Sequence, residues 1–469
     1  MGNIKVLYVS AESFPYAYVG GLGEVGASLP KALSRSGKVE IQRVMPGYKG
    51  VDCEKRTVTD FPVPMGKGYD SCILKTDLTD SEVPTYFVCN DRYFYRDHVY
   101  GYEDDGVRFF FLCSAVLEML KHIPFKPDII HLNDWHTGFI SLLIRSSSMN
   151  VKTVFTIHNI IYHGYIPEEY VDGMLSDKEA KELGRPGYLD FMKAALMFSD
   201  GLTAVSPGYS KEIYSPELTG GLNLLIKARD DKVAGILNGI DTDLYNPEND
   251  DVIKYPYSWN NIENKKKNKK ALCEYFGFPD EDVPLVSMVT RLEWIKGLDL
   301  VAEAMELMAQ EKFRIVIHGS GNPYYQGLLT EMTRRFPEKV AVDFNYSPQL
   351  AKKIYAASDY YLMPSSYEPC GVGQLYAMRY GAVPIVNPVG GLKDTVKDRK
   401  NAKNNNGFHM KNRDAESLAE AMKRAFSLYG TAELDRLREN GMKADWSWKN
   451  SAGQYIKFYT DVLDIRRIK

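Results

Sequence analysis

Short apolar runs alternate with helix-like segments along the first half of the chain. Ile4 to Ser10 and Glu40 to Met45 are strand-like runs, and the stretch between them from Glu24 to Arg35 has the pattern of a helix. Two further apolar runs, Pro127 to His131 and Val151 to Ile157, are each followed by a polar loop. Buried parallel strands have this pattern, and their carboxyl ends carry function. The first half is therefore predicted to be a doubly wound α/β domain.

The alternation is clearer in the second half. Strands are predicted at Leu285 to Thr290, Arg314 to His318, Val340 to Phe344, Tyr360 to Met363 and Val383 to Asn387. Helices are predicted at Gly297 to Ala309, Pro323 to Arg335, Gln349 to Ala357, Gly371 to Tyr380 and in the segment after Ala415. This is the order of a second Rossmann-like domain. Two such domains are expected to have parallel sheets that face each other across a cleft, where a ligand binds.

The pattern stops between Asn249 and Lys270, where the sequence is polar and contains prolines. We place the domain boundary here, which predicts one domain over residues 1–248 and another over 249–456. The same segment contains a basic run of five lysines: Lys265, Lys266, Lys267, Lys269 and Lys270. Runs of like charge are usually solvated helix ends, so this run is assigned no functional role.

Composition narrows the class of protein. In 469 residues, 58 Lys and Arg stand against 61 Asp and Glu, a formal charge of −3, so no global charge attracts nucleic acid or an acidic membrane. The six cysteines form no CxxC pair, which argues against a zinc site and favours a reducing compartment. The N-terminal apolar run is too short for a signal peptide and no 18-residue apolar run follows. A cytoplasmic protein without membrane or nucleic-acid partners is expected.

The glycine-rich stretch Gly21 to Gly26 matches the pattern G-x-G-x-x-G. Its first glycine comes 11 residues after Ser10 rather than directly after the strand, which weakens an NAD-dependent dehydrogenase interpretation. A glycine-rich loop before a helix still presents backbone N–H groups that suit a phosphate. A plain structural turn is the alternative.

Two cations, Arg291 and Lys296, follow the predicted strand Leu285 to Thr290. Together they could neutralise a diphosphate leaving group without a metal ion. Taken alone, the pair is slightly more typical of two surface cations.

Glu368 follows another predicted strand, immediately before a helix, and Gly390 and Gly391 repeat this loop-to-helix design one unit later. Glu368 could meet a sugar hydroxyl or the reacting centre, and the two glycine amides a phosphate. A favourable interaction with the helix terminus is the alternative for Glu368.

A mixture of carboxylate, indole, imidazole and amide groups follows two strands of the first half. Asp134, Trp135 and His136 come after Pro127 to His131, and His158 and Asn159 come after Val151 to Ile157. Stacking combined with directional hydrogen bonds is what sugar recognition requires. A lone histidine would more often be structural, and several polar residues at successive strand ends weaken that alternative.

Taken in order, these segments resemble bacterial glycogen synthases and plant starch synthases, which form glycosyltransferase family 5. The resemblance runs nearly end to end and is carried by these motifs: Gly20-Gly21-Leu22, Asp134-Trp135-His136, Thr156-Ile157-His158-Asn159, Val205-Ser206-Pro207, Leu237-Asn238-Gly239-Ile240-Asp241, Arg291 with Lys296, Glu368-Pro369-Cys370-Gly371 and Gly390-Gly391-Leu392. It implies the GT-B fold, with two Rossmann-like domains across a cleft. It also implies transfer of glucose from ADP-glucose or UDP-glucose to the non-reducing end of an α-1,4-glucan, with retention of configuration.

The resemblance assigns roles to individual residues. The catalytic residues that it implies are Arg291 and Lys296, which correspond to the residues that meet the diphosphate, and Glu368 and His158, which correspond to those beside the donor glucose. The remaining donor-binding positions are Gly20, Gly21, Asn238, Tyr346, which packs on the base, Cys370, Gly371, Gly390, Gly391 and Leu392. The acceptor-binding positions are Asp134, Trp135 and Glu24. The nucleotide sugar and the α-glucan are the expected partners, no metal or other cofactor is expected, and a final helix at about residues 457–469 is expected to return to the first domain.

The sequence departs from the family pattern at a few positions. Tyr18 stands where the family usually has lysine before the glycine loop, so a cation is replaced by a hydroxyl donor. Glu24, Val372 and Val389 replace the usual Asp, Leu and Thr. A GT-B enzyme with another donor or a small acceptor, and a non-catalytic glucan-binding homologue, are the alternatives. No residue of the sequence decides between a covalent intermediate and same-face attack as the route to retention.

Overall fold

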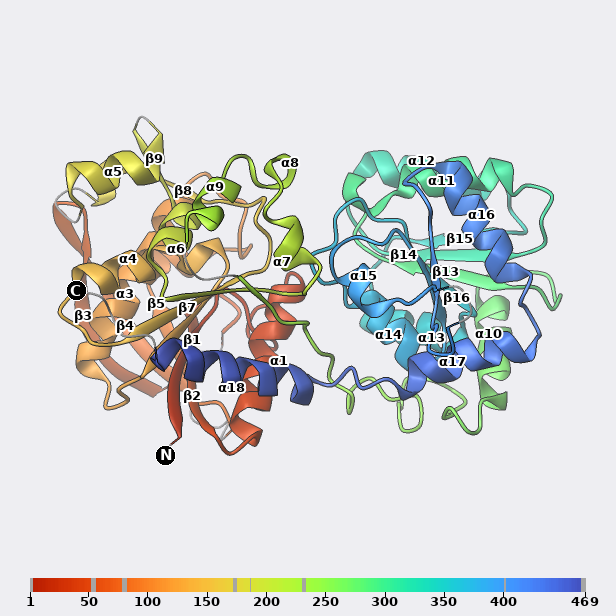
Figure 1. Cartoon of the computed structure of the whole chain (residues 1–469), viewed down its shortest axis with the longest axis horizontal. Helices are drawn as coiled ribbons and strands as arrows, with labels where there is room; N and C mark the ends of the chain where they lie inside the picture. Colours follow the sequence, from red (N-terminus) through yellow and green to blue (C-terminus); the bar gives the residue numbers. More distant parts are fainter. Residues whose placement is uncertain are drawn as a thin grey trace. The chain divides into compact units, whose positions relative to one another are not determined.

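The chain divides into two units, which the computed structural model in Figure 1 colours by sequence. The first unit comprises Met1–Gly239 and Trp448–Lys469, and the second comprises Ile240–Ser447. The structure describes residues 3–464 except 52–55, 78–81, 172–174, 186, 230–232 and 400–401.

The chain passes between the units earlier than the predicted boundaries of 248/249 and 456/457. Ile240 is buried with Ile253 and Tyr257 in an apolar cluster of the second unit, and its N–H donates to Trp446 O at 2.8 Å. Residues 240–248 therefore fold with the second unit, because Ile240 is buried in that cluster and Tyr245 packs against it. The expected return helix begins at Trp448 instead of residue 457, and residues 465–469 lie outside the described residues.

The first unit is built on a nine-stranded sheet of order β12-β11-β7-β6-β1-β2-β5-β4-β3. Its strands from β12 to β5 pair in parallel, and β4 and β3 extend one edge antiparallel. The bounds are β1 Ile4–Val9, β2 Val39–Pro46, β3 Arg56–Met65, β4 Gly68–Asp77, β5 Thr85–Cys89, β6 Ile129–Asn133, β7 Lys152–Ile157, β11 Gly201–Ala204 and β12 Ala234–Gly235. The doubly wound expectation is confirmed, and the antiparallel extension is a feature that the sequence analysis missed.

Helices cover both faces of this sheet (Figure 1). α1 (Gly21–Arg35) and α18 (Trp448–Asp464) share one apolar cluster with β1, β2, β6 and β7. The helices α3 (Asp105–His122), α4 (Phe139–Ser146) and α6 (Phe191–Phe198) lie on the other face. The buried positions of α18 recur at helical spacing, and Tyr459 OH bonds to His131 Nδ1 at 2.7 Å. The C-terminal helix is thus an integral part of the first unit.

The second unit has a six-stranded parallel sheet of order β15-β14-β13-β16-β17-β18. Its strands are β13 Leu285–Val289, β14 Arg314–His318, β15 Val340–Asp343, β16 Tyr360–Met363, β17 Val383–Val386 and β18 Phe408–His409. This is the Rossmann order, in which the chain reverses its direction of winding between the neighbours β13 and β16. Ligands bind at the carboxyl ends of strands at such a point.

The helices of the second unit also form two layers. α11 (Leu298–Leu307), α12 (Pro323–Arg335) and α16 (Ala415–Phe426) pack in one apolar cluster, together with α17 (Ala432–Lys443). α10 (Glu263–Tyr275), α13 (Pro348–Ala357) and α14 (Gly373–Arg379) pack in two others. The predicted strands and helices of this half are confirmed, with ends that differ by one or two residues.

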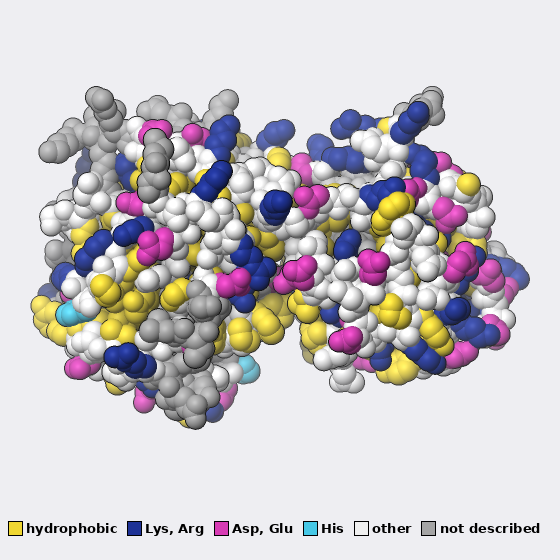
Figure 2. All heavy atoms as spheres, turned by 90° about the horizontal axis from the view of Figure 1, so that it is seen from below, with side chains coloured by type: hydrophobic (Ala, Val, Ile, Leu, Met, Phe, Trp, Pro, Cys, Tyr) yellow, Lys and Arg dark blue, Asp and Glu magenta, His cyan; other side chains and the backbone are white. Residues whose placement is uncertain are grey.

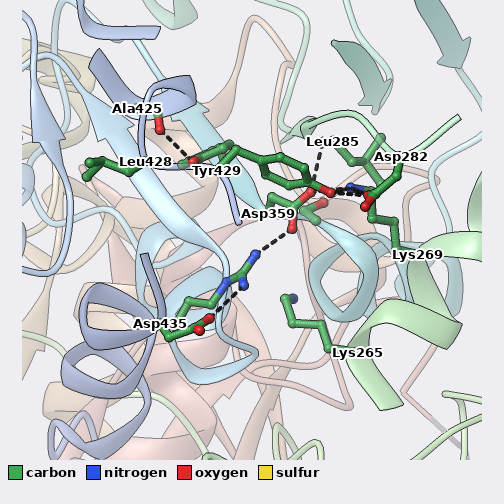
Figure 3. Close-up of polar contacts among 12 residues, drawn as sticks. Lys265, Lys269, Asp282, Leu285, Asp359, Ala425, Leu428, Tyr429 and Asp435 are labelled. Carbon is green, nitrogen blue, oxygen red and sulfur yellow. Dashed lines mark hydrogen bonds and ion pairs between the residues drawn. The ribbon is translucent and has the colours of Figure 1, made fainter. Parts of the chain in front are cut away.

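The basic run lies in α10, and its interpretation as wholly solvated is wrong for two lysines. Lys265 is buried and its Nζ donates to the carbonyls of Tyr355, Ala356 and Tyr380 at 3.3, 3.0 and 2.8 Å. Lys269 Nζ lies 2.6 Å from Asp359 Oδ2 (Figure 3). Burial alone would raise the pKa of Asp359, but the charges of Lys269 and Arg438 outweigh it and hold that pKa below its usual range.

This charged cluster has a structural function. Asp359 precedes β16, so the cluster lies at the amino end of that strand, away from the carboxyl edge where the candidate site is expected. Asp359 also accepts the backbone N–H of Leu285 at 3.0 Å, which ties β13 to β16 (Figure 3).

Surface charge is mixed in sign. Figure 2 shows Lys and Arg interspersed with Asp and Glu over the face in view, in keeping with the small net charge. Among the described residues, no helix is both long enough and apolar enough to cross a membrane.

Candidate active site

The loop after β1 is held by a buried carboxylate that the sequence analysis did not single out. Glu12 is 2% exposed, and its Oε2 accepts the backbone N–H groups of Val19 at 2.6 Å and Gly20 at 3.1 Å. The expectation that the loop's N–H groups would meet a phosphate is thereby narrowed. Two of them already have an anion from within the chain, so a ligand would meet the first turn of α1, from Gly21 onwards.

The glycines of this loop have two different functions. A Cβ added to Gly23 or Gly26 would meet Glu12, at 3.0 Å from its side chain and 2.3 Å from its carbonyl oxygen respectively. A Cβ at Gly20 or Gly21 would meet nothing within 4 Å. The first pair allows α1 to pack against the loop, whereas the second leaves open space for a ligand.

Arg43 also fixes this loop. Its guanidinium is buried and donates to Ser13 Oγ at 2.7 Å, Gly26 O at 2.9 Å and Thr85 Oγ1 at 2.9 Å. Because these partners belong to the loop, α1 and β5, Arg43 ties the glycine loop to the sheet.

Asp134 follows β6 in a strained backbone conformation, with φ of 61°. It is 6% exposed and its Oδ1 has no hydrogen-bond partner in the described part of the chain. Burial raises the pKa of Asp134 to about 7, although hydrogen bonds from the backbone of Trp135 and Asn159 act in the opposite direction. Buried, strained and incompletely satisfied polar groups of this kind are typical of ligand sites.

His158 follows β7, the strand next to β6. Its Nε2 lies 3.1 Å from Asn133 Oδ1, and burial lowers the pKa of the ring to about 3. The ring is therefore neutral at physiological pH. Thr156 O accepts the N–H of Asp134 at 3.1 Å, so the two polar segments after β6 and β7 lie side by side.

The other predicted residues of the first unit differ in what they offer a ligand. Trp135 is partly packed in an aromatic cluster, stacked on His136 at 4.1 Å. Asn238 is 6% exposed and its Oδ1 has no partner among the described residues, which leaves it an acceptor for a ligand. Glu24 is half-buried in the first turn of α1.

In the second unit, the structure brings together Lys296 and Glu368, which follow the neighbouring strands β13 and β16. Lys296 Nζ lies 2.7 Å from Glu368 Oε2, and the side chains are 14% and 12% exposed. Arg291 is more open, at 55% exposed, and pairs with Glu293 at 2.9 Å. A cation and a carboxylate thus meet at the point where the winding of the sheet reverses.

Three glycines make this arrangement possible. Gly371 and Gly390 have φ of +68° and +46°, which favours glycine. A Cβ on Gly390 would lie 2.1 Å from Glu368 O, and one on Gly391 would lie 1.9 Å from Cys370 O. The Gly391 N–H donates to Glu368 O at 3.2 Å. The expected phosphate-binding amide of Gly391 is thus engaged within the chain, where it fixes the Glu368 backbone.

Two predicted donor contacts have buried side chains, since Cys370 is 6% exposed and Leu392 is fully buried. Contact with a ligand is left to their backbone atoms. Tyr346, in contrast, is 49% exposed and stacks on His318 at 5.6 Å with an interplanar angle of 18°. One face of a fixed aromatic ring is therefore suited to stack on a base.

Comparisons with known proteins identify the same two halves. The family model of the starch synthase catalytic domain matches residues 5–228, and that of group 1 glycosyl transferases matches residues 276–444. A glycogen synthase from Moorella thermoacetica is 38% identical, over 99% of this chain and 98% of the relative. One from Geobacillus stearothermophilus is 39% identical, over 98% of both chains.

Solved structures agree with these relatives. The catalytic domain of starch synthase IV from Arabidopsis thaliana, bound to ADP and acarbose, matches with a TM-score of 0.90 at 31% identity, over 99% of this chain and 100% of that one. Sucrose-phosphate synthase from Thermosynechococcus elongatus matches with a TM-score of 0.65 at 18% identity, which shows the fold alone.

Proposed function

The chain belongs to the glycogen and starch synthase family, as a glycosyltransferase with the GT-B fold, and we propose that it transfers glucose from ADP-glucose to the non-reducing end of an α-1,4-glucan. The match to the solved starch synthase that holds ADP and acarbose supports an adenine nucleotide as donor and a glucan as acceptor. Retention of configuration is part of the proposal, because the family resemblance implies it.

The observation that carries the proposal is the contact between Lys296 and Glu368 at the carboxyl edge of the second sheet. A cation stabilises the negative charge that develops on a diphosphate leaving group. A carboxylate held by that cation can accept hydrogen bonds from the hydroxyls of the sugar. The two groups therefore suit the two ends of a nucleotide sugar's reactive bond.

The proposal assigns the neutralisation of the diphosphate to Lys296 and Arg291 rather than to a metal ion. Arg291 lies on the open side, where its fork can reach phosphate oxygens once Glu293 releases it. Tyr346 supplies the stacking face for the base in the second unit, and Gly20 and Gly21 of the first unit leave open space for a ligand. Orientation and charge stabilisation are the main contributions of these residues to the rate.

The polar groups after β6 and β7 are assigned to the sugars. Asp134 has an unsatisfied carboxylate oxygen that can accept a hydrogen bond from a hydroxyl group of the glucan. Neutral His158 can form a hydrogen bond with the donor glucose. Trp135, Glu24 and Asn238 complete the proposed contacts.

The test is transfer of glucose to a maltooligosaccharide from ADP-glucose and, in parallel, from UDP-glucose. A Glu368→Ala variant is the control for the site, because it removes the carboxylate that Lys296 holds. Faster transfer from ADP-glucose that is lost in the control is the expected result. Preference for UDP-glucose would overturn the donor assignment, and transfer from neither would favour a different donor, to which Tyr18 points, or a glucan-binding protein without turnover.

A further inference from the structure

Asn133, the last residue of β6, connects four groups in the interior of the first unit. It is fully buried. Its Oδ1 accepts a hydrogen bond from Tyr8 OH at 2.9 Å and lies 3.1 Å from His158 Nε2. Its Nδ2 donates to Val9 O at 3.0 Å and to His131 O at 3.4 Å.

The orientation of the Asn133 amide follows from these partners. Val9 O and His131 O are backbone carbonyls, which can only accept hydrogen bonds, so the NH₂ group must face them. The amide oxygen therefore faces Tyr8 and His158, and an amide oxygen can only accept. His158 Nε2 must then carry a proton in order to make its hydrogen bond.

The protonation state of the second ring nitrogen of His158, Nδ1, follows from the charge of the ring. Burial keeps the ring neutral, and the neighbouring rings of His131 and His136 are neutral for the same reason. A neutral imidazole carries one proton, so Nδ1 has a lone pair and acts as an acceptor. Nδ1 has no hydrogen-bond partner in the described part of the chain, and the ring is only partly buried.

We propose that Asn133 is a positioning residue that holds the proton of His158 on Nε2, so that Nδ1 accepts a hydrogen bond from a hydroxyl of the transferred sugar. The first part concerns the free protein, and the second rests on the proposed function. His158 then orients the sugar as an acceptor and supplies no proton to the reaction. The other tautomer would present an N–H at Nδ1, which can donate to a hydroxyl oxygen but cannot accept a hydrogen bond from the hydroxyl, and it would turn the Nε2 lone pair toward Asn133 Oδ1.

Nuclear magnetic resonance tests the first part without substrate. The full chain is labelled with ¹⁵N at histidine, and the His158 signals are assigned by comparison with His158→Gln. A protonated Nε2 and an unprotonated Nδ1 at neutral pH are expected. A protonated Nδ1, or an imidazolium, would overturn the proposal even if the protein proves to be an active transferase.

Variants test the role of Asn133 itself. Asn133→Leu is expected to give a mixture of His158 tautomers and to lower kcat/KM for glucose transfer about tenfold, because a His158 ring in the other tautomer loses its one hydrogen bond from the sugar. Tyr8→Phe is the matched control, because it removes the other hydrogen bond to the same Oδ1 and leaves that to His158 intact. It is expected to keep the tautomer and to change kcat/KM less than twofold.

These outcomes separate positioning from a merely structural role. A folded Asn133→Leu protein with the original tautomer and unchanged kcat/KM would refute the proposal. If the unsubstituted chain transfers glucose from neither donor, the proposed function fails, but the tautomer measurement still decides the role of Asn133.

Discussion

Lys296 and Glu368 are 72 residues apart in the sequence, yet their charged groups meet at 2.7 Å. They follow β13 and β16, which pair directly even though β14 and β15 lie between them in the chain. The contact is therefore a product of the Rossmann strand order, and it places opposite charges where this fold binds ligands.

Removal of either charge is expected to reduce transfer far more than stability. Lys296→Ala takes away the cation nearest the proposed diphosphate, and kcat is expected to fall about a hundredfold to a thousandfold, as for other preorganised electrostatic groups. Steady-state kinetics with ADP-glucose measures this. Lys312→Ala is the matched control, because Lys312 pairs with Glu281 at 2.6 Å on the surface, where the side chains are 78% and 46% exposed. Equal kinetics in the two variants would contradict the assignment of Lys296.

The glycines of the first loop separate packing from ligand binding. Gly21→Ala places its methyl in open space and replaces glycine in a helix, so stability is expected to stay the same or rise slightly, whereas transfer is expected to fall. Gly26→Ala forces a methyl to within 2.3 Å of Glu12 O, and its melting temperature is expected to drop by several degrees. Thermal melts and the transfer assay on both variants check this. A Gly21→Ala protein with full activity would show that no ligand approaches this glycine.

The sequence predicted the parallel strands well because each is a short apolar run with a polar loop after it. It missed the β3–β4 hairpin because Ile73 is an exposed apolar residue between the buried Cys72 and Leu74. Those three residues form a continuous apolar run, which hides the buried and exposed alternation of an antiparallel strand. The chain enters the second unit at Ile240, earlier than predicted. The sequence pattern does not show this, because the burial of Ile240 depends on contacts with residues far along the chain.

The residues of the candidate site could be predicted from the sequence where they directly follow a strand. Arg291, Lys296, Glu368, Asp134 and His158 all follow parallel strands, and that rule needs only the sequence pattern. Which of them touch depends on strand order, which the pattern does not contain. Glu12 and Asn133 were missed because each acts through the groups that it binds. Glu12 accepts hydrogen bonds from the backbone of its own loop, and Asn133 contacts His158 but has the sequence pattern of an ordinary strand residue.

The raised pKa of Asp134 predicts a pH-dependent cost to stability. In the unfolded chain this carboxyl titrates near its ordinary value of about 4, whereas burial raises its pKa in the folded protein to about 7. Between these values the folded state retains a proton that the unfolded state has lost. The free energy of unfolding is therefore expected to decrease as pH rises through this window.

Asp134→Asn is the variant that reveals this cost. It is expected to unfold at nearly the same denaturant concentration as the unsubstituted protein at pH 4, and at a higher one at pH 8, because the amide cannot ionise. Urea unfolding curves at the two pH values measure the difference, and Asp200→Asn is a control at a carboxyl whose ion pair with Lys152 lies elsewhere in the first unit. A difference that does not grow with pH would show that Asp134 titrates normally.

Substitution of Tyr18 tests whether a positive charge beside the glycine loop strengthens the binding of ADP. Its ring is 49% exposed and meets Phe14 edge to face, with ring centroids 6.1 Å apart, at the position where the family resemblance leads us to expect lysine. Tyr18→Lys is expected to bind ADP about tenfold more tightly at low salt, since a cation strengthens a hydrogen bond to phosphate. The gain is expected to shrink as salt rises, because the site is open to solvent. Titration calorimetry at two salt concentrations measures both effects. Tyr18→Gln, which loses the ring without adding charge, is the control, and equal affinities for the Lys and Gln variants would mean that the diphosphate lies out of reach of this loop.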